Sequence, residues 1–118
     1  MFKKFLLLVS AGLMAIGPAA AADKVKIGFV TTITTPAGVI GKDMVDAVNL
    51  AMEDIGGKMA GLDVELIVED DGFKPAIGKQ KTDKLVKQDK VQFVTGFIWS
   101  HVLLASQKSA LGAGKFLI

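Results

Sequence analysis

The sequence has 118 residues, with 14 basic and 12 acidic side chains, no cysteine and a single histidine, His101. Every basic residue is a lysine, and the lysines are interleaved with acids, which argues against a nucleic-acid-binding surface. The lack of cysteine excludes disulfides and thiolate metal sites within this sequence, and one histidine cannot form a histidine-rich metal site.

Residues 1–22 have the pattern of a secretory signal peptide: a basic start, an apolar run over residues 5–16, and an Ala-rich A-x-A site that predicts cleavage before Asp23. A membrane anchor, the alternative, needs about 20 apolar residues, which is more than this run supplies. No cysteine follows the run, so we expect no lipoprotein attachment. We therefore expect a soluble periplasmic chain, residues 23–118, whose 12 acids balance the 12 lysines left after Lys3 and Lys4 are removed.

The stretch from residue 25 to residue 55 predicts a strand, a loop and a helix. Residues 25–31 are mostly apolar and strand-favouring. Residues 32–41 contain one proline and two glycines, which break regular structure. Residues 42–55 have apolar side chains at steps of three and four, which predicts a helix with one apolar face. Ligands of open α/β sheets bind outside the carboxyl ends of the strands, so residues 32–41 are a candidate binding loop.

The rest of the sequence repeats this alternation of strands and helices. The resulting order, βαβαβαβ, predicts an α/β fold: a parallel sheet with helices on both faces. The last residues have the apolar character of the start of a strand, and we interpret the sequence as a fragment of a longer protein. The predicted elements are a strand at 62–69, a helix at 75–88, a strand at 91–95, a loop at 97–101, a helix at 102–111 and a strand that begins at 115.

An acidic cluster, Glu69–Asp71, ends the second predicted strand. Its spacing does not match a calcium-binding loop, so we interpret it as a polar strand end or as a source of caps for the next helix. The lysines of that helix are interpreted as a solvated face rather than a partner-binding patch. Gly78 within the helix lowers its helix propensity, and close packing on a neighbour is one explanation.

No enzyme motif fits the sequence. Residues 38–43 and 112–116 each resemble part of a phosphate-binding loop but lack its spacing or its Ser/Thr after the lysine. Ser100 and His101 are adjacent and have no indicated acid partner, so they do not form a triad. The Trp99–Ser100 pair at the tip of the third strand, before a helix start that would favour a carboxylate, is a candidate binding site. Trp99 is either a ligand contact or a core residue, and the sequence does not decide between the two.

Several motifs together resemble the branched-chain amino-acid-binding family of ABC-transporter substrate-binding proteins. They are Val-Lys-Ile-Gly-Phe-Val at 25–30, Thr-Pro-x-Gly-x-x-Gly-Lys-Asp at 35–43, the helix with Ala47, Ala51 and Ile55, Glu-Asp-Asp at 69–71, and Phe-Val-Thr-Gly at 93–96 before a serine-bearing loop. The resemblance covers residues 23–118. It implies a type I periplasmic-binding fold, of which this chain matches the first part of the N-terminal lobe.

The resemblance also implies a ligand site on the loops after the first, third and fourth strands of the lobe, of which this sequence contains the first two. Ser100 matches a position that hydrogen-bonds the polar head of the ligand, and Trp99 and Ile98 flank it. In the first loop the implied contacts are Thr34, Thr35 and Ile40. The usual Ser-Gly-Pro of that loop is Thr-Thr-Pro here, and the third loop has one large ring and few hydroxyls.

These departures favour a carboxylate with an apolar or aromatic body over a simple amino acid. The implied protein is a monomeric, non-enzymatic receptor without metal or cofactor, which binds a small-molecule solute between two lobes and delivers it to an inner-membrane ABC permease. The alternative is the sensory domain of a signalling or amide-sensing regulator with the same fold. A secreted nucleotide-dependent enzyme is the third interpretation.

Overall fold

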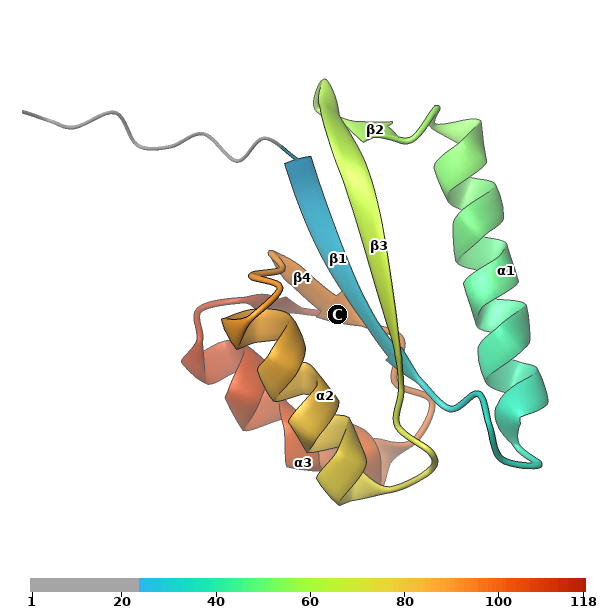
Figure 1. The fold of residues 1–118 in the computed structure, drawn as a ribbon, viewed down its shortest axis with the longest axis vertical. Coiled ribbons are helices and arrows are strands. Elements are labelled where there is room, and N and C mark those ends of the chain that lie inside the picture. The colour runs from blue at the N-terminus through green and yellow to red at the C-terminus, as the bar shows by residue number, and fades with distance from the viewer. Residues whose placement is uncertain (1–23) are drawn as a thin grey trace, which may run out of the picture.

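The computed structural model describes residues 24–118; the predicted signal peptide lies outside the described residues. Figure 1 shows a sheet with one helix on one face and two on the other. The elements are β1 (Lys24–Thr31), α1 (Gly38–Asp54), β2 (Lys58–Met59), β3 (Leu62–Asp70), α2 (Pro75–Lys87), β4 (Phe93–Thr95), α3 (Ser100–Gly112) and β5 (Phe116–Leu117).

The sheet has the strand order β2-β3-β1-β4-β5. β1 pairs in parallel with β3 and with β4, and β5 pairs in parallel with β4. The predicted parallel sheet with helices on both faces is therefore confirmed. Because β1, β3 and β4 run in the same direction, their carboxyl ends lie at one edge of the sheet, and the loops that follow them lie together there.

The main core lies between the sheet and the pair α2 and α3. Val30 of β1 and Val94 of β4 are fully buried and face Leu85 of α2 in this core. Gly28 lets α2 approach the sheet, since a Cβ there would lie 2.8 Å from Cδ1 of Leu85. The buried members of the cluster are Val30, Leu85, Val86, Val91, Val94 and Ala110.

The first helix begins earlier than its sequence predicts. α1 starts at Gly38 rather than at Lys42, so Ile40 belongs to the helix and not to the loop. A Cβ at Gly38 would lie 1.9 Å from the carbonyl oxygen of Ile33, and a Cβ at Gly41 would lie 1.9 Å from that of Thr32. The two glycines therefore do not break the helix; they let its first turn pack directly on the preceding loop.

Smaller differences concern short elements. Lys58–Met59, which lie outside the predicted elements, form a two-residue strand, β2, which pairs antiparallel with β3. β4 starts at Phe93 rather than at Val91, whose amide instead donates to the carbonyl of Leu85 at the end of α2. α3 starts at Ser100, two residues before the predicted position.

The lysines of α2 lie among acids. Lys79 and Lys87 are 53% and 69% exposed and both pair with Asp83, at 2.6 and 2.9 Å. Lys81 and Lys84 pair with Glu69 of β3. Burial acts to raise the pKa of Glu69, but hydrogen bonds from these two lysines outweigh it and lower the pKa. The lysines thus form the ion-paired outer face of α2.

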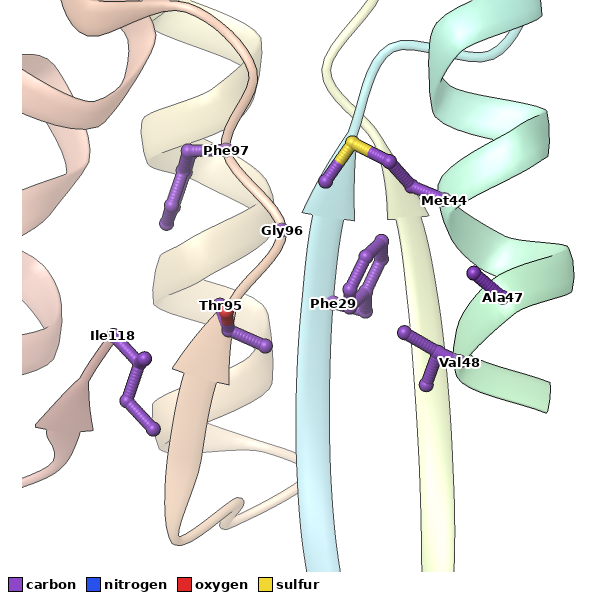
Figure 2. A pocket seen from close by; sticks show the side chains of 8 residues that line it. All are labelled: Phe29, Met44, Ala47, Val48, Thr95, Gly96, Phe97 and Ile118. Carbon is purple, nitrogen blue, oxygen red and sulfur yellow. The ribbon is translucent and has the colours of Figure 1, made fainter. Parts of the chain in front are cut away.

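An apolar hollow of about 340 Å³ lies between α1 and the sheet. Figure 2 shows Phe29 of β1 pointing towards Met44 and Val48 of α1, with Thr95 and Ile118 across from them. Thr95 supplies the one side-chain hydroxyl in this lining, and no lining residue is charged. The side chains that line the hollow are therefore mainly apolar. Separately, none of the helices within residues 24–118 has the length and apolarity needed to span a membrane.

Candidate ligand-binding site

Three loops meet at the carboxyl edge of the sheet: residues 32–37 after β1, residues 71–74 after β3, and residues 96–99 after β4. The first and third are joined by a hydrogen bond, in which Trp99 Nε1 donates to Thr32 Oγ1 at 3.0 Å. The two loops that the sequence singled out therefore emerge at the same end of the sheet and touch.

Asp71 connects the second loop to the first. Its carboxylate is fully buried, and Oδ1 accepts from the Thr32 hydroxyl at 2.5 Å and from the Phe73 amide at 2.8 Å. Oδ2 has no hydrogen-bond partner within residues 24–118. The expectation that an acid of this cluster caps the next helix is wrong for Asp71: α2 has Lys74 at its N-cap and no side-chain cap. The side chain turns into the protein, where the Thr32 hydroxyl and a loop amide satisfy one of its oxygens.

Asp70 also connects the second loop to the first, nearer the surface. Its carboxylate accepts from the amides of Ile33 and Gly72, at 2.8 and 2.9 Å, and from the Thr34 hydroxyl. Burial acts to raise the pKa of Asp70, but these hydrogen bonds, the Thr34 hydroxyl first, outweigh it and lower the pKa. Within the described chain, no group of three or more His, Cys, Asp or Glu side chains could hold a metal ion. The acidic cluster thus holds two loops together.

The three loops enclose a groove of about 360 Å³, here called the loop groove. Two aromatic rings dominate it: Phe73 and Trp99 meet edge to face, with ring centroids 4.8 Å apart and planes at 86°. Phe73 also contacts His101, at 5.0 Å and 77°. Lys74 adds a cation. The lining residues are Thr35, Pro36, Ala37, Gly72, Phe73, Lys74 and Trp99.

Two of the predicted site residues line the loop groove, and a third lies next to it. Trp99 and Thr35 both line it, and the buried Thr35 hydroxyl has no hydrogen-bond partner in the described part of the chain. Ser100 follows Trp99 directly, is exposed, and is the first residue of α3. The helix start therefore brings a hydroxyl and the positive end of the α3 dipole to this edge.

The other three predicted residues do not line the loop groove. Ile98 is half-buried in the loop before Trp99, and the Thr34 hydroxyl is engaged by Asp70. Ile40 is 45% exposed on the first turn of α1. The structure thus brings Trp99 and Thr35 together in the loop groove, with Ser100 next to Trp99 in the chain, and Ile40 is not among the residues that line it.

Sequence reasoning missed Phe73 and the role of Asp71. Phe73 has a left-handed backbone conformation, φ 65°, directly after Gly72, φ 55°, and this turn brings its ring to Trp99. Such a conformation is uncommon outside glycine, so no residue pattern predicts it. The acids did carry a signal: they end a parallel strand beside the candidate loop, so they had to lie near Thr32.

A parallel α/β sheet with a groove at the carboxyl edge of its strands is the architecture of a ligand-binding lobe. A family profile described as periplasmic binding protein matches residues 24–118, and the chain belongs to this family. A comparison with curated protein sequences gives no match.

Solved structures of similar proteins share the fold. An ABC transporter substrate-binding protein from Sphaerobacter thermophilus is 29% identical, with a TM-score of 0.76 over 80% of this chain and 25% of its own. A solute binding protein of an ABC transporter from Rhodopseudomonas palustris, in complex with 3,4-dihydroxybenzoic acid, is 28% identical, with a TM-score of 0.77 over 80% of this chain and 26% of its own.

The branched-chain amino acid transporter substrate binding protein LivJ from Streptococcus pneumoniae, in complex with isoleucine, is also 28% identical, with a TM-score of 0.75 over 80% of this chain and 28% of its own. The present chain therefore spans about a quarter of the length of these proteins.

Proposed function

We propose that this chain is part of the solute-binding component of an ABC importer and supplies one side of its ligand site. The observation that carries the proposal is the loop groove, which opens at the carboxyl edge of the sheet and is lined from three loops. Membership of the periplasmic binding protein family and the similarity to ABC substrate-binding proteins support it.

The ligand we propose is a small carboxylate with an apolar or aromatic body. Phe73 and Trp99 offer apolar ring surface for such a body. Ser100, the α3 N-terminus and Lys74 offer a hydroxyl, a positive dipole end and a cation for its carboxylate. Among the similar proteins, one is in complex with 3,4-dihydroxybenzoic acid and another with isoleucine, so both an aromatic acid and an amino acid deserve testing.

The proposed mechanism is closure of two lobes around the solute. A ligand that contacts both lobes only in the closed state shifts the equilibrium towards closure by its differential affinity, and no covalent step is needed. The proposed partner is an inner-membrane permease, the proposed location is the periplasm, and the protein acts as a monomer.

Isothermal titration calorimetry of the full-length protein tests the ligand class, with benzoate, 3,4-dihydroxybenzoate, leucine and isoleucine as titrants and ATP as the non-binding control. Trp99 lines the loop groove, so its indole N–H signal in NMR, identified by its loss in Trp99→Phe, reports binding there directly. We expect the aromatic acids to bind and to move this signal. Tight binding of leucine with no binding of the aromatic acids would reject the proposed ligand class. Binding of ATP alone would reject the importer role.

A further inference from the structure

Three hydrogen-bonded side chains link all three loops beneath the loop groove. Trp99 Nε1 donates to Thr32 Oγ1 at 3.0 Å, and the Thr32 hydroxyl donates to Asp71 Oδ1 at 2.5 Å. We call this the Trp99–Thr32–Asp71 network. Thr32 and Asp71 are fully buried, while Trp99 is half-buried and reaches the groove.

The chemistry of the three groups fixes the direction of each hydrogen bond. An indole N–H can only donate, and an ionised carboxylate can only accept. The Thr32 hydroxyl must therefore accept from Trp99 and donate to Asp71. The Thr32 hydroxyl is the one member of the network that can both donate and accept. Its proton is therefore used in the hydrogen bond to Asp71 as long as that carboxylate is present.

Asp71 is itself held by a second donor. The Phe73 amide donates to Asp71 Oδ1 at 2.8 Å, and the Phe73 ring packs edge to face on Trp99 at 4.8 Å. Trp99 is thus fixed from two directions, by its indole N–H through Thr32 and by its ring through Phe73. Thr32 and Phe73, which impose these two constraints, both donate a hydrogen bond to Asp71 Oδ1.

We infer that Asp71 is a positioning residue, which acts through Thr32 to hold the Trp99 ring as an apolar side of the loop groove. Since the indole N–H is committed to Thr32, Trp99 offers a solute ring surface and no hydrogen bond. The inference deepens the proposed function, because it assigns Trp99 the role of selecting apolar surface. The polar head of the solute must then be recognised by other groups, such as Ser100 or Lys74.

The positioning role is testable without any ligand. The indole N–H of Trp99 gives a cross-peak in a ¹H–¹⁵N spectrum, and its loss in Trp99→Phe identifies it. Thr32→Val keeps the size of the side chain but removes the hydroxyl. We expect the cross-peak to shift and its exchange with solvent to become about fivefold faster, the factor expected from losing one net hydrogen bond. Thr32→Ser restores the hydroxyl and should restore the wild-type signal.

Thr34→Val is the matched control. Thr34 lies in the same loop and its hydroxyl also donates to an aspartate, Asp70, but it makes no hydrogen bond to Trp99. It should leave the indole signal in place. An equal shift in Thr34→Val and Thr32→Val would show general loosening of the loop and would overturn the inference.

Asp71→Ala tests whether Asp71 acts through Thr32. The Thr32 hydroxyl is still present in this variant but has lost its acceptor, so the indole signal should move in the same direction as in Thr32→Val. If Asp71→Ala does not fold, Asp71→Asn takes its place, and the weaker amide acceptor should give a smaller shift of the same sign. An unchanged indole signal in the folded variant refutes the inference.

The ligand experiment separates this inference from the proposed function. Indole shifts in the Thr32 and Asp71 variants, together with no binding of the four solutes to the wild type, would uphold the positioning role and reject the proposed ligand class. Solute binding to the wild type, with an indole signal that these variants leave unchanged, would support the proposed ligand class and refute the positioning role.

Discussion

Gly78 of α2 lies against Val102 of α3 so closely that a Cβ on the glycine would be 2.3 Å from Cγ1 of the valine. Val102 is fully buried, and the two helices pack along this contact. The glycine weakens α2 as an isolated helix but lets it approach its neighbour. This is the physical explanation for a residue that sequence reasoning flagged without being able to account for it.

Gly78→Ala should destabilise the protein despite the better helix propensity of alanine. The propensity gain is about 1 kcal/mol, whereas overpacking a tight contact costs about 1–3 kcal/mol. We therefore expect the free energy of unfolding, measured by urea denaturation, to fall by about 1 kcal/mol. In the double variant with Val102→Ala the clash is relieved, and the loss should be smaller than the sum of the single losses. Additive losses would contradict the contact.

Gly96→Ala should be more damaging than any other glycine substitution in the loops at the carboxyl edge. Gly96 has φ +96°, and a Cβ there would lie 2.8 Å from the ring of Phe29. Backbone strain and overpacking each cost on the order of 1–3 kcal/mol, so we expect the melting temperature to fall by several degrees. The control is Gly112→Ala at the end of α3, where a Cβ meets open space. Equal effects of the two variants would contradict this interpretation.

Asp83 should stabilise the folded state in a pH-dependent way. Hydrogen bonds from Lys79 and Lys87 lower its pKa from 3.8 to about 2. A carboxyl whose pKa is lower in the folded state stabilises that state fully above its ordinary pKa, and the contribution is lost as the pH falls through the folded value. Asp83→Asn should therefore lower the free energy of unfolding at pH 7, by no more than about 1 kcal/mol for such exposed pairs.

Most of the difference between Asp83→Asn and the wild type should be lost by pH 2, where the Asp83 carboxyl is about half-protonated in the folded state because its pKa there is about 2. It should also shrink in about 1 M salt, which screens exposed charges. Urea denaturation at pH 7, 4 and 2, repeated at pH 7 in about 1 M salt, measures both trends. A difference that stays constant down to pH 2 would rule out the ionised carboxylate as its source.

Ser100→Ala should weaken binding of the proposed carboxylate. A hydrogen bond to a charged group is worth about 1.5–3 kcal/mol, so we expect the dissociation constant to rise at least about tenfold in calorimetry. Ser109→Ala is the matched control, since it removes the same hydroxyl nine residues further along α3, about 13 Å away by the rise of the helix. If both variants bind like the wild type, Ser100 does not contact the ligand.

The signal peptide remains a prediction that mass spectrometry can test directly. Protein exported to the periplasm of a Gram-negative host should begin at Asp23, because the A-x-A site precedes it. The mass of the mature protein should be lower by that of residues 1–22. An exported product that retains these residues would contradict the predicted cleavage.

The order and direction of the main elements were predictable because hydrophobic periodicity, strand-favouring runs and Gly/Pro breaks all agreed. Errors arose where a contact between distant residues overrode local preference. Gly38 and Gly41 favour a loop by propensity, but close approach to the loop backbone places them in α1. β2 has two residues, too few to show any periodicity.

The candidate site was predictable in its place and only partly in its members. The loops that contain Trp99 and Thr35 follow from the rule that loops after parallel strands meet at one edge, and the family resemblance singled out Thr35 within its loop. The position of the Phe73 ring depends on a left-handed turn, which no sequence pattern predicts. An aspartate at position 71 could either cap the next helix or hydrogen-bond to a neighbouring loop, and the sequence is the same in both cases. Only the fold shows that Asp71 has the second role. Ligand contact stays a prediction for all six residues: Ser100, Trp99, Ile98, Thr34, Thr35 and Ile40.

None of the residues that line the loop groove belongs to the buried cluster that holds α2 and α3 on the sheet. The residues that line the groove and the residues that stabilise the fold therefore occupy separate positions in the sequence. A lineage of such proteins could acquire a different cargo by mutations in the three connections, without rebuilding the interior that makes the lobe fold.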